Sequence, residues 1–277
     1  MPELPEVETT RRGLLGSVCG RRIRRAIVRH RGMRLPVPRG IEQRLAGAVV
    51  RQLRRRGKYL IFDCDTADGQ PGSLILHLGM SGRLWRVDSG TPPQKHDHFD
   101  LEMDNGRVIR LRDPRRFGLV LWCKGDPLAH PLLKNIGPEP LTADFDGAVL
   151  HEGTRHRKTA IKPVIMDSRL VCGVGNIYAN EALFRAGIDP RTPANRLSRA
   201  RCNALAQEIK TVLSEAINAG GSSLRDYVGS DGMAGNFQNH FLVYGRAGQP
   251  CMRCGSIIRE TKQAQRASCW CPGCQSR

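Results

Sequence analysis

Two pairs of cysteines near the C-terminus constrain the fold more than any other feature. Cys251 and Cys254 form one CxxC pair, Cys271 and Cys274 form another, and sixteen residues separate the pairs. Such pairs bring four thiolates to one tetrahedral Zn²⁺, with each sulfur about 2.3 Å from the metal. Four protein ligands leave no open position, so we predict one structural zinc. Zinc binding would supply the folding free energy of the cysteine-rich C-terminal segment, which is too short to bury a core of its own.

The other six cysteines fit a different role. Cys269 is close enough in sequence to Cys271 to compete for the metal, but the matched CxxC spacing favours Cys271. Thiols or a metal site are expected rather than a disulfide framework, because the N-terminus lacks the pattern of a signal peptide. Five scattered cysteines are predicted to be core residues: Cys19, Cys64, Cys123, Cys172 and Cys202.

The charge balance points to a polyanionic partner. The chain has 44 Lys+Arg against 26 Asp+Glu, a net charge of +18, and 36 of the basic residues are Arg. Arginine binds phosphate oxygens with two parallel hydrogen bonds, so this excess favours nucleic acid. A solvated basic surface is the alternative. No apolar run approaches the roughly 20 residues of a membrane span, which leads us to expect a cytoplasmic protein.

Hydrophobic periodicity divides the chain into a strand-rich and a helix-rich part. A first helix is predicted over residues 3–16, and a proline-rich boundary over residues 127–140. Short strand-like segments separated by Gly, Pro and Asp predict eight strands of a sandwich or barrel: residues 23–30, 45–53, 59–63, 73–78, 82–87, 98–103, 107–111 and 118–122. Helical spacing follows in residues 144–152, 160–167, 177–186 and 198–219.

The N-terminus offers a second chemical signal. Removal of Met1 would leave a secondary amine on Pro2, beside Glu3 and Glu6. An α-amine with a pKa near 7.8 is about 10% neutral at pH 7, whereas a lysine at 10.4 is about 0.04% neutral. Such an amine can attack an aldehyde-like sugar carbon and form a Schiff base, while neighbouring acids move protons. From spacing alone, the acids equally fit a simple helix cap.

Six motifs together resemble one known family. They are residues 1–9 (MPELPEVET), 57–59 (GKY), 77–82 (HLGMSG), 113–118 (DPRRFG) and 173–178 (GVGNIY), followed by the four-cysteine tail. In this order they resemble the bacterial formamidopyrimidine-DNA glycosylases, from residue 1 to residue 277. These enzymes excise oxidised purines such as 8-oxoguanine and formamidopyrimidines, and then cleave the strand by β,δ-elimination.

The resemblance implies an α+β fold of three domains. A catalytic β-sandwich with flanking helices is expected over residues 1–130, a helix–two-turns–helix DNA-binding domain over 131–242, and a β-hairpin zinc finger over 243–277. It also implies a monomer that acts on duplex DNA containing an oxidised purine, in the bacterial cytoplasm. No redox cofactor or catalytic metal is expected.

The resemblance also assigns roles to single residues. Pro2 resembles the nucleophile, Glu3 the acid/base, Glu6 a supporting acid and Lys58 the catalytic-site lysine. Met80, Arg115 and Phe117 match the residues that fill the gap left by an everted nucleotide, although by pattern alone Met80 and Phe117 would be core. Phosphate contacts are implied for Asn176, Lys162, Tyr244 and Arg266.

A Gly- and Ser-rich stretch resembles the loop that closes over the everted purine. Its residues are Ser222, Ser223, Leu224, Arg225, Asp226 and Tyr227. This loop separates the purine enzymes from the sister family, endonuclease VIII, which prefers oxidised pyrimidines. That sister activity is one alternative function, and a zinc-finger DNA-binding protein without catalysis is the other.

Overall fold

The computed structural model describes residues 2–222 and 235–277. The chain divides into two compact units. The first comprises Met1–Lys134 and Ala219–Asn236, and the second comprises Asn135–Asn218 and Phe237–Arg277. The described residues 219–222 and 235–236 therefore group with the N-terminal unit. The division into three domains stays a prediction.

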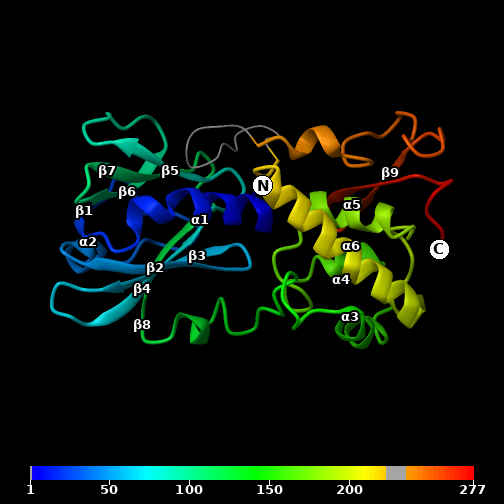
Figure 1. The fold of residues 1–277 in the computed structure, drawn as a ribbon, viewed down its shortest axis with the longest axis horizontal. Helices are drawn as coiled ribbons and strands as arrows, with labels where there is room; N and C mark the ends of the chain where they lie inside the picture. The colour runs from blue at the N-terminus through cyan, green and yellow to red at the C-terminus, as the bar shows by residue number, and fades with distance from the viewer. Residues whose placement is uncertain (1, 223–234) are drawn as a thin grey trace. The chain divides into compact units, whose positions relative to one another are not determined.

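Two antiparallel four-stranded sheets form the first unit (Figure 1). One has the order β1-β6-β7-β5, with β1 Ile23–Val28, β6 Asp97–Met103, β7 Arg107–Arg112 and β5 Arg83–Asp88. The other has the order β2-β3-β4-β8, with β2 Val49–Arg56, β3 Tyr59–Asp65, β4 Pro71–His77 and β8 Leu119–Lys124. Each of the eight strands overlaps one predicted segment.

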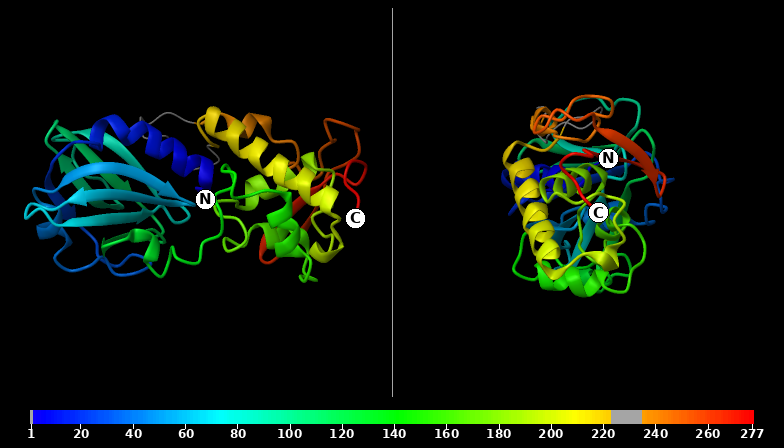
Figure 2. Two further views of the ribbon diagram at one scale, coloured as in Figure 1. Left: turned by 60° about the horizontal axis from the view of Figure 1, so that its bottom comes forward. Right: turned by 90° about the vertical axis from the view of Figure 1, so that its right-hand side faces the viewer.

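The two sheets share one core, so the predicted sandwich is confirmed. Phe62 and Leu76 from the second sheet lie in the same buried cluster as Leu101 and Ile109 from the first. Helix α1 (Leu4–Val18) contacts β2 and β5, one strand of each sheet, and runs beside them in Figure 2. The cluster also holds the short helix α2 (Ile41–Leu45), which takes Leu45 out of its predicted strand. A five-residue helix is too short to show a 3.6-residue period.

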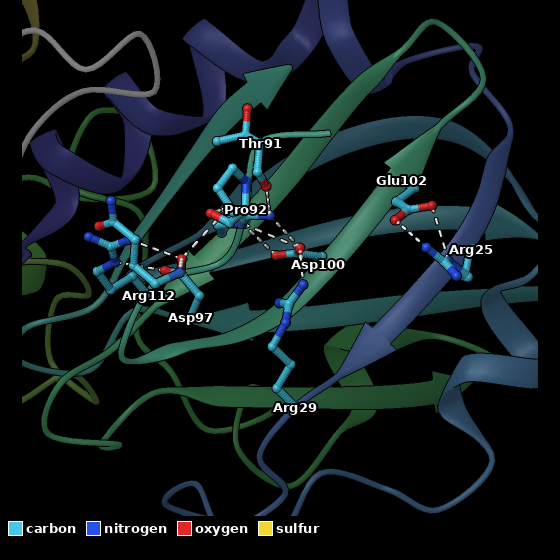
Figure 3. Close-up of polar contacts among 10 residues, drawn as sticks. Arg25, Arg29, Thr91, Pro92, Asp97, Asp100, Glu102 and Arg112 are labelled. Atoms are coloured by element: carbon cyan, nitrogen blue, oxygen red, sulfur yellow. Dashed lines mark hydrogen bonds and ion pairs between the residues drawn. The ribbon is translucent and has the colours of Figure 1, made fainter. Parts of the chain in front are cut away.

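Buried ion pairs hold the β1-β6-β7-β5 sheet and its connecting loop (Figure 3). The Arg110 guanidinium lies against Asp100 at 2.9 Å and also donates hydrogen bonds to the carbonyls of Thr91 and Pro92. Asp100 also accepts a hydrogen bond from a second arginine, Arg29, at 2.7 Å. Charged groups stay buried at low cost only when they are paired and hydrogen-bonded. These arginines therefore serve the sheet rather than a polyanion.

Glu8 of α1 ties the helix to the second sheet. Its carboxylate accepts hydrogen bonds from Arg11 and Arg12 of the same helix and from Arg55 of β2, at 2.8, 2.9 and 3.1 Å. Burial raises the pKa of this carboxyl, but the hydrogen bonds of Arg11 and Arg12 and the charges of Arg11 and Arg55 outweigh it. They bring the pKa from the usual 4.5 down to about 2.

Glu8→Gln is expected to lower the free energy of unfolding at pH 7 by about 2–3 kcal/mol. A depressed pKa stabilises the fold above the unfolded value, and that contribution fades as pH falls. The gap between wild type and variant should therefore close from pH 4.5 to pH 2. Urea unfolding across this range checks it. Glu152→Gln, which breaks an exposed pair with Arg155, is the control and should change little. A difference in the free energy of unfolding that stays constant with pH would contradict this role of Glu8.

The second unit combines four helices with a small hairpin. The helices are α3 Gly147–Thr154, α4 Ile161–Ile165, α5 Asn176–Arg185 and α6 Arg199–Asn218, each inside or overlapping a predicted segment. The hairpin consists of β9 Arg259–Gln263 and β10 Arg266–Trp270, as expected for the zinc finger. Helix α5 contacts α4, α6 and β10, so it is the central element of this unit. Short 3-10 turns complete the structure: Pro127–Ala129, Ala194–Arg196 and Phe237–His240.

The mixed α+β class is thus confirmed. Within the described part of the chain, every helix is too short or too polar to cross a membrane.

Candidate active site

The N-terminus is a buried segment that carries two acidic side chains. Pro2, Glu3 and Glu6 are all buried. The backbone N–H of Glu3 donates to Glu6 Oε2 at 2.8 Å, and the Glu3 side chain accepts from the backbone of Glu6, which forms a capping box. The acids do cap the helix, as the simpler interpretation requires. The same geometry holds both carboxyl groups next to the residue that would carry the amine.

Glu6 also reaches a distant segment of the chain. Its Oε1 accepts the backbone N–H of Ser222 at 2.8 Å. Ser222 pairs with Asn236, and the Asn236 N–H donates to the carbonyl of Ala219 at 3.1 Å, so both ends of the segment between them are joined. Glu6 therefore links the N-terminus to the base of the predicted lesion loop. Ser222 is buried there, and the other residues of that loop lie outside the described part: Ser223, Leu224, Arg225, Asp226 and Tyr227.

Lys58 occupies the tight turn between β2 and β3, beside His77. Tyr59 pairs with His77 in the register of β3 and β4, and their rings lie 4.8 Å apart. Burial and the positive charges of Lys58 and Arg34 lower the pKa of His77 to about 4. The imidazole is therefore neutral at pH 7.

His77 is a site residue that the sequence interpretation did not single out. Its Nδ1 accepts the N–H of Gly79 at 2.9 Å, so the proton of the neutral ring resides on Nε2. A neutral Nε2–H beside Lys58 is a fixed hydrogen-bond donor. The signal was present in the HLGMSG motif, but only strand pairing brings this histidine to the lysine.

The three residues predicted to fill a gap in DNA are presented at the surface. Met80 is 41% exposed and Phe117 is 44% exposed, so the core alternative for these two side chains is wrong. The guanidinium carbon of Arg115 lies 4.8 Å from the centre of the Phe117 ring, a cation–π distance. An exposed thioether, an exposed ring and a guanidinium thus come from two neighbouring loops.

In the second unit, Asn176 begins helix α5 after a glycine-rich turn. Gly173 has a φ of 83°, a left-handed conformation that favours glycine. The Asn176 Oδ1 is buried and finds no hydrogen-bond partner among the described residues. The first backbone N–H groups of a helix also attract anions. Tyr244 is fixed close to this helix, because its N–H donates to Glu181 Oε1 of α5 at 2.8 Å.

Lys162 does not match its predicted role as a direct contact to DNA. It is only 1% exposed. Its ammonium group donates to the carbonyl of Ala267 at 2.6 Å and to Ser268 Oγ at 2.8 Å. These bonds fasten the β9–β10 hairpin to α4. The ammonium group of Lys162 is buried and hydrogen-bonded within the protein, so this residue positions the hairpin instead of contacting a phosphate.

Arg266 is the first residue of β10, and its side chain is exposed. It follows Ala264 and Gln265, whose φ angles of 46° and 62° are left-handed and form a tight two-residue turn. Non-glycine residues rarely adopt this conformation, and such strain is concentrated at functional sites. Arg266 and Lys162 line a common cavity of about 110 Å³. The buried lysine therefore supports the hairpin that presents the arginine.

The four predicted zinc ligands come together. The sulfur atoms of Cys251, Cys254, Cys271 and Cys274 all lie within 4.8 Å of one another. Two pairs of sulfurs are 3.3 and 3.9 Å apart, close to the roughly 3.8 Å edge of a tetrahedral zinc–thiolate site. The residues thus fit one structural zinc.

The remaining cysteines lie away from this cluster. The Cys269 thiol donates to Glu260 at 3.5 Å, which settles its competition with Cys271 for the metal. Cys64, Cys172 and Cys202 are buried as predicted, and Cys19 is partly buried and packs against the core of the first unit. Cys123 is partly exposed and lies outside that core, so the core prediction is wrong for this residue.

Three family descriptions match the chain in order. Residues 1–120 match the formamidopyrimidine-DNA glycosylase N-terminal domain, residues 136–228 its H2TH domain, and residues 248–277 a zinc finger found in FPG and IleRS. A formamidopyrimidine-DNA glycosylase of Cupriavidus pinatubonensis is 53% identical over 286 residues, which cover 99% of this chain and 100% of that protein.

Two solved structures of Lactococcus lactis Fpg are similar to this one. A variant in complex with a Fapy-dG-containing DNA has a TM-score of 0.91 and 37% identity, and covers 100% of both chains. A complex with DNA containing an abasic site has a TM-score of 0.90 and 36% identity, over 99% of this chain and 100% of that chain. The chain belongs to the formamidopyrimidine-DNA glycosylase family.

Proposed function

We propose that this protein is a DNA glycosylase and AP lyase that removes oxidised purines from duplex DNA. The observation that carries the proposal is the buried N-terminus, in which Pro2 directly precedes the capping box of Glu3 and Glu6. The relatives whose structures contain Fapy-dG or an abasic site support the substrate class. The protein is proposed to act as a monomer in the cytoplasm, where its DNA substrate lies.

Pro2 supplies the nucleophile. Its neutral nitrogen attacks C1′ of the damaged nucleotide and forms an N–C1′ bond, while the C1′–N9 bond breaks and the base leaves with a proton. Glu3 protonates the ring oxygen, so the sugar opens to an iminium ion. The iminium makes the C2′ proton acidic. The Glu3 carboxylate takes this proton as the 3′ phosphate is expelled, and a second elimination expels the 5′ phosphate. Water then hydrolyses the iminium, which frees Pro2, releases the sugar remnant and leaves a one-nucleotide gap.

Eversion of the damaged nucleotide must precede this chemistry, because C1′ is not accessible inside a stacked duplex. Unstacking a base costs a few kcal/mol. Met80 and Phe117 offer apolar surfaces that fill the gap, and Arg115 offers hydrogen-bond donors to the unpaired partner base. Their exposure supports this role, because a wedge must reach the stack.

Phosphate groups around the lesion are bound by residues of both units. Lys58, Asn176, Tyr244 and Arg266 are the proposed contacts, and Lys162 acts by holding the hairpin of Arg266. His77 adds a neutral Nε2–H donor beside Lys58. Zinc, held by the four cysteines, would keep this hairpin folded and takes no part in the reaction.

Affinity for damaged duplex should depend steeply on salt. If six to ten phosphates are neutralised, the association constant should fall about 10³–10⁵-fold between 50 and 200 mM salt. Fluorescence anisotropy with a duplex that carries an uncleavable abasic-site analogue measures this slope. A nearly flat response would contradict a phosphate-binding surface of this size.

Parallel cleavage assays test the proposed substrate class. Duplexes containing 8-oxoguanine and thymine glycol are incubated with the same preparation, and product ends are analysed. The proposal predicts faster excision of 8-oxoguanine and phosphates at both ends of the gap. Faster excision of thymine glycol would assign the pyrimidine activity instead. Tight DNA binding with no cleavage of either duplex would leave a binding protein without catalysis.

A further inference from the structure

One buried carboxylate joins the two loops that carry the proposed wedge. Asp113 is 0% exposed and directly follows β7. Its Oδ1 accepts the hydroxyl of Ser81 at 2.8 Å, and its Oδ2 accepts the backbone N–H of Gly118 at 2.8 Å. Ser81 Oγ in turn accepts the backbone N–H of Arg115 at 3.2 Å. A single side chain therefore spans the loop of Met80 and the loop of Arg115 and Phe117.

Asp113 is itself fixed by its own backbone. Its N–H donates to the carbonyl of His96 at 3.0 Å, and its carbonyl bonds to His98 Nε2 at 3.0 Å. The preceding residue, Arg112, forms two hydrogen bonds with Asp97, at 2.6 and 2.9 Å (Figure 3). Hydrogen bonds to residues in and beside strand β6 therefore hold Asp113 in place.

The loops of Met80 and Phe117 pack so closely at Gly79 that no side chain larger than that of glycine fits there. A Cβ on Gly79 would lie 2.5 Å from the carbonyl carbon of Phe117 and 2.6 Å from the nitrogen of Gly118. Arg116 (φ 58°) and His96 (φ 73°) adopt left-handed conformations that non-glycine residues rarely take. Such strained residues persist only where surrounding contacts hold them. The contacts made by Asp113 are of that kind.

We infer that Asp113, with Ser81, is a positioning residue that holds Met80, Arg115 and Phe117 as one preformed wedge. The inference rests on the proposed function. The backbone of both loops is fixed while the tips of Met80 and Phe117 stay exposed. A preformed wedge has little conformational entropy left to lose when it enters DNA, so eversion is faster than with two independent loops.

A variant pair with matched chemistry tests this. Ser81→Ala deletes the hydroxyl that joins Asp113 to Arg115. Ser73→Ala is the control, because Ser73 Oγ donates to Asp63 at 2.8 Å in a comparable serine–aspartate bond within the second sheet. The probes are an 8-oxoguanine duplex with 2-aminopurine next to the lesion, and a second duplex with a preformed abasic site.

Ser81→Ala should slow both the rise of 2-aminopurine fluorescence and single-turnover excision by about tenfold, the usual effect of losing one charged hydrogen bond. Borohydride trapping on the abasic duplex should stay within about twofold of wild type, because no base has to be everted there. Ser73→Ala should leave all three rates within about twofold of wild type. Ser81→Thr keeps the hydroxyl and should restore the fluorescence rate.

Equal rates for Ser81→Ala and Ser73→Ala would overturn the inference, as would an equal loss of trapping on the abasic duplex, which would place the defect in the active site. Asp113→Asn is a second variant. It loses one of the two acceptors and should slow eversion at least as much as Ser81→Ala. If it does not fold, Ser81→Ala carries the test. A wild-type protein that neither excises nor traps would contradict the proposed function instead.

Discussion

Chains in which the nitrogen of Pro2 is blocked, by retained Met1 or by acetylation, are expected to lose excision and strand cleavage by about 10³-fold or more. The chemistry depends on this one group, and Pro2 is buried directly before the capping box of Glu3 and Glu6. An ordinary lysine amine would be a poor substitute, because with a pKa near 10.4 it is about 0.04% neutral at pH 7.

Mass spectrometry of the intact N-terminus gives the fraction of unblocked chains in each preparation. Specific activity should rise in proportion to that fraction. The control is DNA affinity, which should be equal in blocked and unblocked preparations if the amine acts in chemistry alone. Full activity in a preparation that retains Met1 would remove Pro2 from the mechanism.

Loss of zinc is the second change with a large expected effect. Cys254→Ser should reduce bound zinc from one per chain to none and weaken binding to damaged duplex by about 100-fold or more, because metal binding supplies roughly 10–16 kcal/mol of apparent folding free energy in such modules. Besides the metal, the hairpin is held by the bonds of Lys162 and by one small apolar cluster. Its small cluster contains Val243, Ile258 and Phe184 of helix α5. Unfolding would displace Arg266 and release the contacts of Lys162.

Cys269→Ala is the matched control. Cys269 is buried in the same cluster, yet its thiol bonds to Glu260 and lies outside the four-sulfur site. This variant should keep one zinc per chain and bind DNA close to wild type. Atomic emission for the metal and anisotropy for the DNA measure both quantities. Stoichiometric zinc in Cys254→Ser, or loss of zinc in Cys269→Ala, would contradict the assigned ligand set.

The architecture was largely predictable because its signals are local. Short strand-like segments bounded by turn residues marked all eight strands of the sandwich, and helical spacing marked the four helices of the second unit. The zinc site was predictable from spacing alone, since CxxC pairs leave few alternatives. Helix α2 was missed because five residues carry no clear period.

The site was harder to predict wherever a role depends on distant partners. Lys162 looked like one more cation for DNA, but Ala267 and Ser268 arrive from about a hundred residues later and bury it. Asp113 belongs to a motif chosen for Arg115 and Phe117, and its link to Ser81 exists only in the folded sheet. Sequence spacing cannot show such pairings before the strands are in register.

The arginine excess has a similar explanation. Many arginines of the N-terminal unit are paired with acids: Arg11, Arg12 and Arg55 with Glu8, Arg25 with Glu102, Arg29 with Asp100, and Arg54 with Asp63. Paired guanidinium groups contribute less to the binding of a polyanion than their number suggests. The contacts proposed for DNA are therefore few and specific, and buried pairs such as Arg29 with Asp100 hold the fold.

Identification of the cross-linked atom tests the central claim most directly. The native protein is mixed with an 8-oxoguanine duplex and sodium borohydride, and the trapped adduct is digested and sequenced by mass spectrometry. The mechanism predicts one nucleotide remnant per chain, attached to the nitrogen of Pro2 in a peptide that begins at that residue. Attachment to Lys58 or any other lysine, or no adduct from protein whose chain begins at Pro2 with a free amine, would contradict it.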